Sequence, residues 1–327
     1  MFLPPKRPAL SCLTRGTLFC DGLRAAPGHE ALAEARDDLD AADGLQQFGM
    51  LTEVALRWFL RGADPDYPRF VEINDTPEVA DNLFAAVRGD AVYRITGDVS
   101  ELFDFNLSVH SSWVWIKPSL PFGDIGLRDI AVNEGGTFEL ILGGAERPGN
   151  WLVLPETAEF IQLREYHADF ASHRAGLWTI ERLDADDLAP PRQTSKDVAG
   201  RFAATLAWAG SYGSFHRWSI RSGSTFPDQP NTMRPPAPNR GGNKHIWYGF
   251  GRYGLDEGEA LVLEFARPEA RLWSVQWLLD PWYENPDLLT QLTGITGDEA
   301  HLDNDGRVRI VFAARDPGVR NWLDVSG

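Results

Sequence analysis

Most hydrophobic residues of the chain fall in short runs rich in β-branched, aromatic and leucine side chains, a composition typical of strands. Turn residues separate these runs at short intervals, as at Gly135-Gly136. The predicted strands are Tyr67–Ile73, Ala91–Gly97, Leu102–Val109, Ser112–Ile116, Thr137–Gly143, Glu159–His167, Leu177–Leu183, Gly258–Phe265, Ala270–Leu279 and Arg307–Ala314. Because helical segments do not alternate with them, the pattern favours antiparallel sheets packed as a sandwich or jelly roll.

A helical period replaces this pattern between Glu30 and Arg61, where apolar residues recur at steps of three and four along one face. These residues are Leu45, Phe48, Leu51, Ala55 and Phe59. Gly62 and Pro65 then end the run. The stretch is predicted to be one long helix, or two helices broken near Asp43-Gly44.

A second helix is predicted where Val198, Phe202, Leu206 and Ala209 share one face. Residues 222–244 contain almost nothing apolar and are predicted to be a long loop, a type of segment that often serves as a lid or binding loop. The polar segment Asp184–Lys196, which contains prolines, has the composition of a linker.

Three segments follow from these patterns. Residues 1–66 are predicted to be irregular and helical, and residues 67–190 a first β-rich domain. Residues 191–327 supply a helix, the long loop and C-terminal strands that complete a jelly-roll-like domain. The predicted fold class is mainly β, an antiparallel sandwich or jelly roll with N-terminal and inserted helices.

Aromatic residues are concentrated between His245 and Glu284, which indicates either a large core or the lining of a ligand cavity. Trp273 and Trp277 lie on one face of a predicted strand, where a core role competes with ligand stacking. Trp282 follows Asp280-Pro281 in a predicted turn, where burial in the core is less expected than on a strand. The predicted ligand-stacking residues include Trp247, Trp277 and Trp282, with Arg252 and Asn321 nearby to orient a polar group.

Several segments together resemble the DUF1214 family, bacterial proteins named for a domain of unknown function. They are Ala80–Asp98, Gly149–Pro155, Gln162–Phe170, Trp178–Asp187, Tyr248–Phe265, Arg271–Trp277 and Asp305–Asp324. The resemblance extends over residues 35–325. It implies a jelly-roll-like sandwich for the C-terminal domain, after a smaller β-domain, and it implies no agreed reaction.

The charge and composition of the chain limit the kinds of partner that can be expected. The net charge of -16 disfavours nucleic acid and anionic membranes, and no apolar stretch reaches the length of a membrane span. The N-terminus lacks the apolar core of a signal peptide, so a cytoplasmic location is expected. Cys12 and Cys20 are expected to be free thiols rather than a disulfide.

Histidines supply the candidate acid–base chemistry. His167 and Asp169 are two residues apart, so on one strand they face the same way, and a carboxylate suits an oriented imidazole. His110 is the second candidate, with Asn106 on the same strand face. No pair of histidines has the spacing of a cupin-type metal site, so neither a metal nor another cofactor is predicted. A facial set of Glu165, His167 and Asp169 with a third ligand such as His110 is the metal-binding alternative.

We therefore expect an enzyme that acts on a hydrophobic or aromatic small molecule by hydrolysis, elimination or isomerisation without a cofactor. His110, His167, Asp169 and Tyr248 are the predicted catalytic residues, and Asn106 joins the predicted binding residues. Alternatives are a non-catalytic module that binds a carbohydrate or hydrophobic ligand, and an assembly role as a homo-oligomer. A further alternative is terpene-cyclase-like acid chemistry at Asp184–Asp187, whose four letters match that motif.

Overall fold

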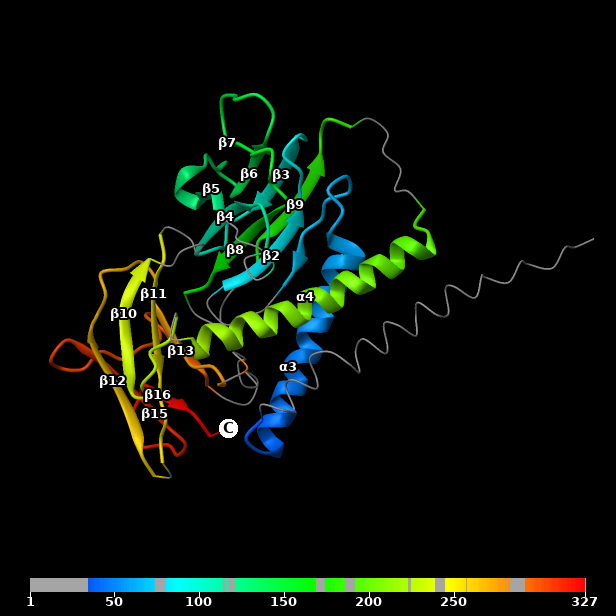
Figure 1. Cartoon of the computed structure of the whole chain (residues 1–327). Coiled ribbons are helices and arrows are strands. Elements are labelled where there is room, and N and C mark those ends of the chain that lie inside the picture. Colours follow the sequence, from blue (N-terminus) through cyan, green and yellow to red (C-terminus); the bar gives the residue numbers. More distant parts are fainter. Residues whose placement is uncertain are drawn as a thin grey trace, which may run out of the picture.

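The computed structural model describes residues 35–73, 80–113, 116, 121–168, 174–185, 192–222, 225–238, 245–256, 258–280, 282 and 292–326. The fold is mainly β and sandwich-like with two long helices, as the sequence predicts. Figure 1 shows a group of strands crossed by the helices and a second group of strands, β10 to β16, beside it.

Two sheets form the first group. The larger, sheet A, has the strand order β1 (Val71–Glu72), β2 (Ala80–Ala86), β8 (Phe160–Tyr166), β4 (Asp104–His110) and β5 (Pro121–Gly126). The smaller, sheet B, has the order β7 (Trp151–Leu152), β6 (Thr137–Leu142), β3 (Tyr93–Asp98) and β9 (Leu177–Arg182). All these pairs are antiparallel except β6 with β7.

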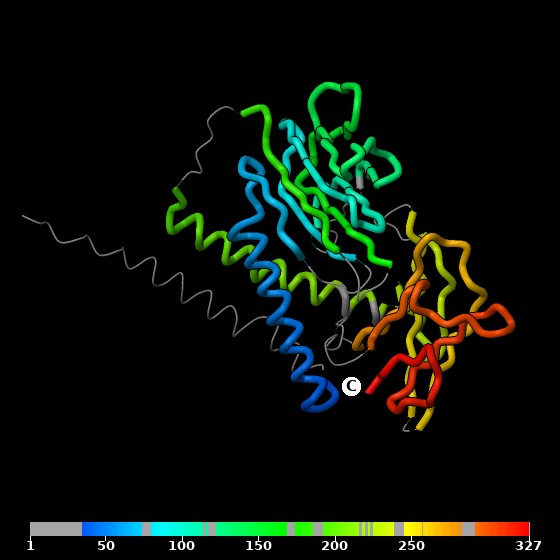
Figure 2. Tube along the Cα trace, turned by 180° about the vertical axis from the view of Figure 1, so that it is seen from behind, coloured from blue at the N-terminus to red at the C-terminus, as the bar shows by residue number. Residues whose placement is uncertain are grey.

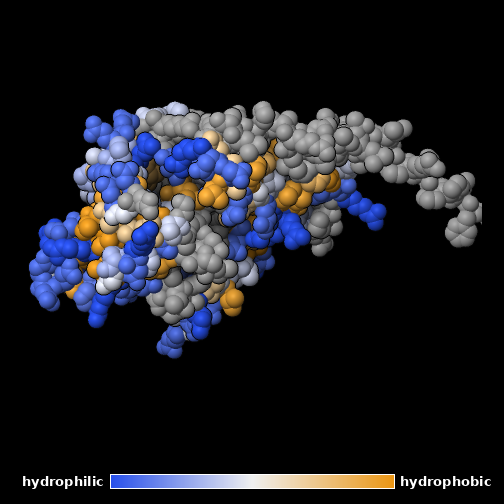
Figure 3. Space-filling view, turned by 90° about the horizontal axis from the view of Figure 1, so that it is seen from below, coloured by the Kyte–Doolittle hydropathy of each residue, from blue (hydrophilic) through white to orange (hydrophobic). Residues whose placement is uncertain are grey.

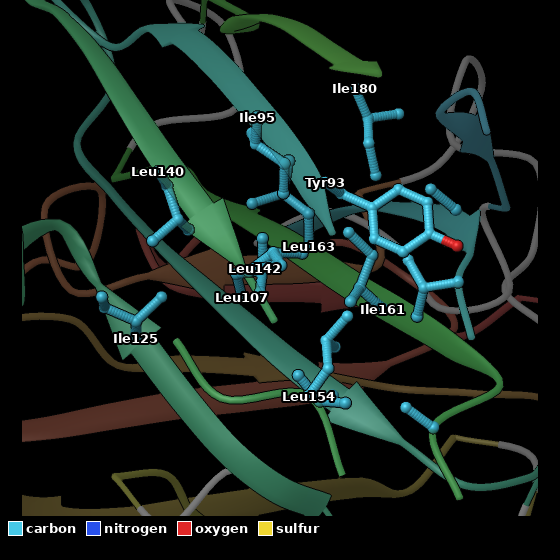
Figure 4. Close-up of a cluster of buried hydrophobic side chains, with 14 of the residues drawn as sticks. Tyr93, Ile95, Leu107, Ile125, Leu140, Leu142, Leu154, Ile161, Leu163 and Ile180 are labelled. Atoms are coloured by element: carbon cyan, nitrogen blue, oxygen red, sulfur yellow. The ribbon is translucent and has the colours of Figure 1, made fainter. Parts of the chain in front are cut away.

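Alternate residues of both sheets meet in a common core. Leu107 of β4 and Leu163 of β8 are fully buried in this cluster with Ile95 of β3 (Figure 4). Tyr93 also lies in it, and its hydroxyl donates to the carbonyl of Pro65 at 2.9 Å, which satisfies the polar end of a buried ring. Because side chains alternate across a strand, the neighbours of these residues in sequence point to the opposite face of each sheet.

The opposite face of sheet A is covered by α3 (Asp38–Arg57) and α4 (Ser195–Arg221), which also contact each other (Figure 2). Asp37 caps α3, and Thr194 begins α4 in a capping box with Asp197. A π-helical turn, η1 (Trp58–Gly62), follows α3. The second core lies between the helices and the sheet and consists of Leu51, Ala55, Trp58, Val71, Ile73, Phe84, Ala86, Trp113, Phe160, Trp208, Ala209 and Tyr212.

One helix, rather than two, passes through Gly44. The residue is buried, and a Cβ built there would lie 2.7 Å from the ring of Trp282. Glycine at this position therefore allows close contact with a distant segment of the chain and does not break the helix. The packing also groups α4 with α3 and sheet A, although the sequence analysis assigns α4 to the segment 191–327.

The second group of strands contains three small sheets. They are β12 (Ala260–Ala266) with β15 (Arg307–Ala313) and β16 (Trp322–Asp324), β13 (Ser274–Gln276) with β14 (Gly294–Thr296), and β10 (Thr232–Pro238) with β11 (Trp247–Arg252). The first two of these sheets share a core that includes Trp277, Ile310 and Leu323. Seen from below the view of Figure 1, the described part of the surface carries hydrophilic and hydrophobic residues in adjoining patches (Figure 3).

In this group β12 pairs with β15, and β13 pairs with β14. One sequence prediction here is wrong. The predicted loop 222–244 contains β10, whose seven residues are all exposed. This strand pairs along one edge only, and Pro235 and Pro236 fall at its register shift, so it needs neither apolar alternation nor every N–H.

The predicted strand Ser112–Ile116 is also wrong in part, because Ser112 lies in a bend, Trp113 in irregular backbone and Ile116 in a turn. None of the helices in the described part of the chain combines the length and apolar character that crossing a membrane requires.

Candidate functional site

Polar side chains are concentrated on the face of sheet A that the helices cover. This face carries every second residue of β2, β4 and β8, including Phe84 and Phe160 of the second core. Asp104 and Tyr166 are paired at one end of this face. Its other polar members on these three strands are Asn82, Asn106, Ser108, His110, Gln162 and Arg164, and we call these six residues the polar patch.

The strand register arranges the polar patch in rows. Asn82, Arg164 and Asn106 are paired across β2, β8 and β4. Gln162 and Ser108 form the next row, and His110 lies one row further, opposite Phe160. Asn106 and His110 therefore share a face, with Ser108 between them on the same strand, and the other three members come from pairing with β2 and β8.

Most of the polar patch is buried, with exposed fractions of 4% for Asn82, 5% for Asn106, 3% for Ser108 and 8% for His110. The side-chain amide of Gln162 donates to Asn82 Oδ1 at 3.0 Å. In contrast, Asn106 Oδ1 is buried and accepts no hydrogen bond from the protein. A buried acceptor without a partner costs about 1–3 kcal/mol, so this atom is one that a ligand group or water can satisfy.

Ser108 and His110 form a hydrogen-bonded pair, with Ser108 Oγ 2.9 Å from His110 Nε2. The imidazole stacks on Phe160 at 5.0 Å between ring centroids. Burial lowers the pKa of His110 to about 3, and the positive charge of Arg164 adds to this effect. The imidazole is consequently neutral at neutral pH, and its tautomer decides which atom of the pair donates.

Aromatic rings border the polar patch at its His110 end. Trp113 stacks on Phe160 at 4.3 Å, and Trp58 and Trp208 each meet Trp113 edge to face at 5.6 Å. This arrangement places a cluster of buried aromatic rings next to a row of hydrogen-bonding groups, a combination of side chains that also occurs in small-molecule sites.

A second polar cluster lies on the opposite face of sheet A. His167 Nε2 is 3.0 Å from Asp81 Oδ2, and Glu165 Oε1 accepts hydrogen bonds from the N–H of Gly176 at 2.8 Å and from the indole of Trp178. Burial raises the pKa of Glu165. One ligand atom from each of Asp81, Glu165 and His167 lies within 4.8 Å of the others, so the set can hold a cation. The contact of His167 with Asp81 and the hydrogen bonds that Glu165 accepts from Gly176 and Trp178 satisfy these groups without a cation.

The two histidines predicted to be catalytic do not share a site. His110 lies opposite Phe160, whereas His167 follows the other end of β8, roughly 20 Å away at the rise of a β-strand. They also belong to clusters on opposite faces of the sheet. Asp169, the predicted partner of His167, lies outside the described residues, and the partner that is described for His167 is Asp81.

The tryptophans predicted to bind ligand have different environments. Trp277 is 5% exposed and belongs to the core of the second group of strands. Trp282 is 3% exposed, and its indole N–H donates to Asp40 of α3. Trp247 is 65% exposed on β11, where Tyr248 stacks on Phe250 at 6.2 Å. These rings do not line one common pocket.

Arg252 and Asn321 have structural partners. Arg252 Nη2 donates to Asp280 Oδ2 at 2.9 Å. Asn321 is buried and fixes a turn, since its side chain bonds the N–H and the carbonyl of His301 and the carbonyl of Arg309.

The acid motif Asp184–Asp187 is described only in part, because Asp186 and Asp187 lie outside the described residues. Asp184 is bonded by Arg182, and this contact holds the pKa of Asp184 below its usual value. The central aspartate of the motif, which would protonate an alkene, is Asp186, so the described residues do not test this alternative.

Two open hollows lie elsewhere on the surface. One, of about 520 Å³, lies along α4 between Leu206 and Trp218. The other, of about 610 Å³, lies between Asp66 and the end of β9. Neither is lined by a residue of the polar patch or by a predicted site residue.

His110 and Asn106 are candidates from the sequence alone. The sequence did not indicate that Asn82, Ser108, Gln162 and Arg164 lie beside them. The alternation of Asn106, Ser108 and His110 with Leu107 and Val109 was the available signal. Polar residues at every second position of a strand usually indicate a solvated face. Here a layer of helices covers that face, which one strand alone does not reveal.

The fold defines a mainly β protein with a buried polar patch beneath a helical layer. The family model of DUF1214, a protein of unknown function, matches residues 252–327, so the resemblance is confirmed over that part of the range 35–325. The polar patch lies before the matched residues. No curated protein matches the chain.

Solved structures that are similar to this chain include the following two. A putative uncharacterized protein from Burkholderia cenocepacia has a TM-score of 0.84 and 24% identity, covering 98% of this chain and 92% of that chain. This likeness shows a shared fold. The VPA0106 protein from Vibrio parahaemolyticus has a TM-score of 0.42 and 11% identity, covering 85% and 89% of the two chains.

Proposed function

We propose that this protein binds a small hydrophobic or aromatic molecule against the polar patch and transforms it by acid–base chemistry without a cofactor. The observation that carries the proposal is Asn106 Oδ1, a buried acceptor without a protein partner. It lies in a group of buried hydrogen-bonding side chains beside stacked aromatic rings. An unsatisfied buried acceptor destabilises the folded protein, and a hydrogen bond from a bound ligand would remove this cost.

Ser108 and His110 are the proposed acid–base pair. A neutral imidazole 2.9 Å from a hydroxyl can accept its proton and return it to a leaving atom. The low pKa of His110 makes the free protein a weak base. A ligand with negative charge would offset Arg164 and raise this pKa, so binding would activate the pair. The reaction classes remain hydrolysis, elimination and isomerisation.

Native mass spectrometry of the freshly purified full chain tests the binding step. We expect the wild-type protein to carry a small organic molecule that is lost from Asn106→Leu and His110→Leu. The control is Asn304→Leu, at an exposed position, which should retain the adduct. The proposal is overturned if the wild type carries no adduct, or if both patch variants retain it.

The chemical step has a separate test. The extracted molecule is incubated with the wild-type protein and with His110→Gln and is followed by NMR, which detects isomerisation as well as cleavage. We expect conversion by the wild type only, with binding retained in the variant. A molecule that returns unchanged from the wild-type protein would indicate a binding module rather than an enzyme.

A further inference from the structure

Arg164 occupies the centre of the polar patch. It lies on β8 between Asn82 of β2 and Asn106 of β4, and its side chain is half-buried. Its positive charge acts within the patch, because it adds to the effect of burial in lowering the pKa of His110. A guanidinium in this position requires hydrogen-bond acceptors or a counter-ion, because burial removes water that would otherwise solvate the charge.

Acidic partners are abundant elsewhere in this chain, which has 47 Asp and Glu against 31 Lys and Arg. Arg94 on sheet B bonds Glu181, Arg252 bonds Asp280, and Arg309 bonds three carboxylates. The Arg164 guanidinium forms neither a hydrogen bond nor an ion pair with the residues that the structure describes. An unmatched guanidinium in such an acidic protein leaves a positive charge within the polar patch.

We infer that the ligand of the polar patch is a small organic acid whose carboxylate is bound by Arg164 and whose body extends along β8 toward Phe160. This inference rests on the proposed function. Arg164 and Phe160 are four residues apart on the same face of β8, roughly 13 Å at the rise of a strand. A ligand that reaches both is therefore about the length of a two-ring aryl acid.

Different residues of the patch lie at the two ends of such a ligand. A guanidinium binds a carboxylate through two parallel N–H bonds, which the amide of the same skeleton cannot accept in the same way. Phe160 is 3% exposed and is stacked with both His110 and Trp113, so these rings form the far end of the site. Beside Arg164, in the same row, Asn106 Oδ1 can accept from a ligand hydroxyl or from a water molecule.

The test compares acids with their neutral amides as probes. 4-Biphenylcarboxylate and 2-naphthoate are each paired with the corresponding carboxamide, and binding to the full chain is measured by calorimetry. We expect each acid to bind at least about tenfold more tightly than its amide. Arg164→Gln should abolish this preference, and Arg164→Lys should keep a part of it because the charge remains.

Arg94→Gln is the matched control, because it removes the same charge from the outer face of sheet B and should leave the preference unchanged. Circular dichroism confirms that each variant is folded. Equal binding of acid and amide by the wild type, or a preference that survives in Arg164→Gln, would overturn the inference.

The experiments distinguish an error in this inference from an error in the proposed function. If native mass spectrometry finds a neutral molecule that depends on Asn106, the site stands and the role of Arg164 as an anion ligand is wrong. If there is no adduct and neither the acids nor the amides bind at millimolar concentration, both proposals are overturned.

Discussion

At the scale of single residues, two asparagines of equal burial have opposite roles. Asn106 and Asn321 are each 5% exposed. Asn321 makes three side-chain hydrogen bonds that fix a turn, whereas Asn106 Oδ1 makes none. The first residue stabilises the fold, and the second leaves a desolvated acceptor without compensation.

Substitution by leucine should therefore have opposite effects at the two positions. Asn321→Leu removes three bonds and leaves buried backbone groups unpaired, so the free energy of unfolding should fall by about 2–4 kcal/mol. Asn106→Leu removes an unsatisfied acceptor and should leave that free energy unchanged or raise it by about 1 kcal/mol. Urea denaturation at neutral pH measures both. A loss above about 1 kcal/mol in Asn106→Leu would mean that Asn106 is structural.

At the scale of elements, the helices could be predicted from apolar spacing, but the glycine in α3 could not be interpreted. A local pattern cannot show that Trp282 lies against Gly44 with its indole bonded to Asp40, since 242 residues separate Asp40 from Trp282. For the same reason the exposed strand β10 was missed, because its partner β11 defines it and its own composition does not. Tertiary contact outweighs propensity in both cases.

Two glycines of α3 test this interpretation. Gly44→Ala places a methyl group 2.7 Å from the ring of Trp282, so the helix must shift and the free energy of unfolding should fall by about 1–3 kcal/mol. Gly49→Ala has nothing within 4 Å and should raise it by about 0.5–1 kcal/mol, because alanine is the better helix former. Equal gains in the two variants would show that Trp282 does not pack on α3 in solution.

At the scale of the whole molecule, the sequence correctly predicts the β-rich sandwich but directs attention to the wrong group of aromatic residues as a shared cavity lining. The tryptophans between Trp247 and Trp282 are divided among a core, a contact with α3 and an exposed strand. The polar patch instead depends on pairing among β2, β4 and β8 and on the two helices that cover them. Such a site is defined only when long-range pairings are known.

Two opposing electrostatic effects set the response of the whole fold to acid. The net charge of -16 repels itself, and this repulsion weakens as the pH falls toward the pI of 4.8, which stabilises the folded state. His110 acts in the opposite direction. Its pKa is about 3 in the fold against 6.5 for the free side chain, so below pH 6.5 the unfolded chain binds a proton that the folded chain does not.

The contribution of His110 to stability is therefore fully present above pH 6.5 and is lost progressively as the pH falls toward 3. Between pH 7.5 and 5.5 the wild type should lose about 1.4 kcal/mol of unfolding free energy relative to His110→Gln, which cannot titrate. Urea denaturation at the two pH values gives this difference. His301→Gln, at an exposed histidine, is the control and should follow the wild type. Parallel curves for the wild type and His110→Gln would show that His110 titrates as an exposed imidazole, and the acid–base role proposed for a buried neutral side chain would then be wrong.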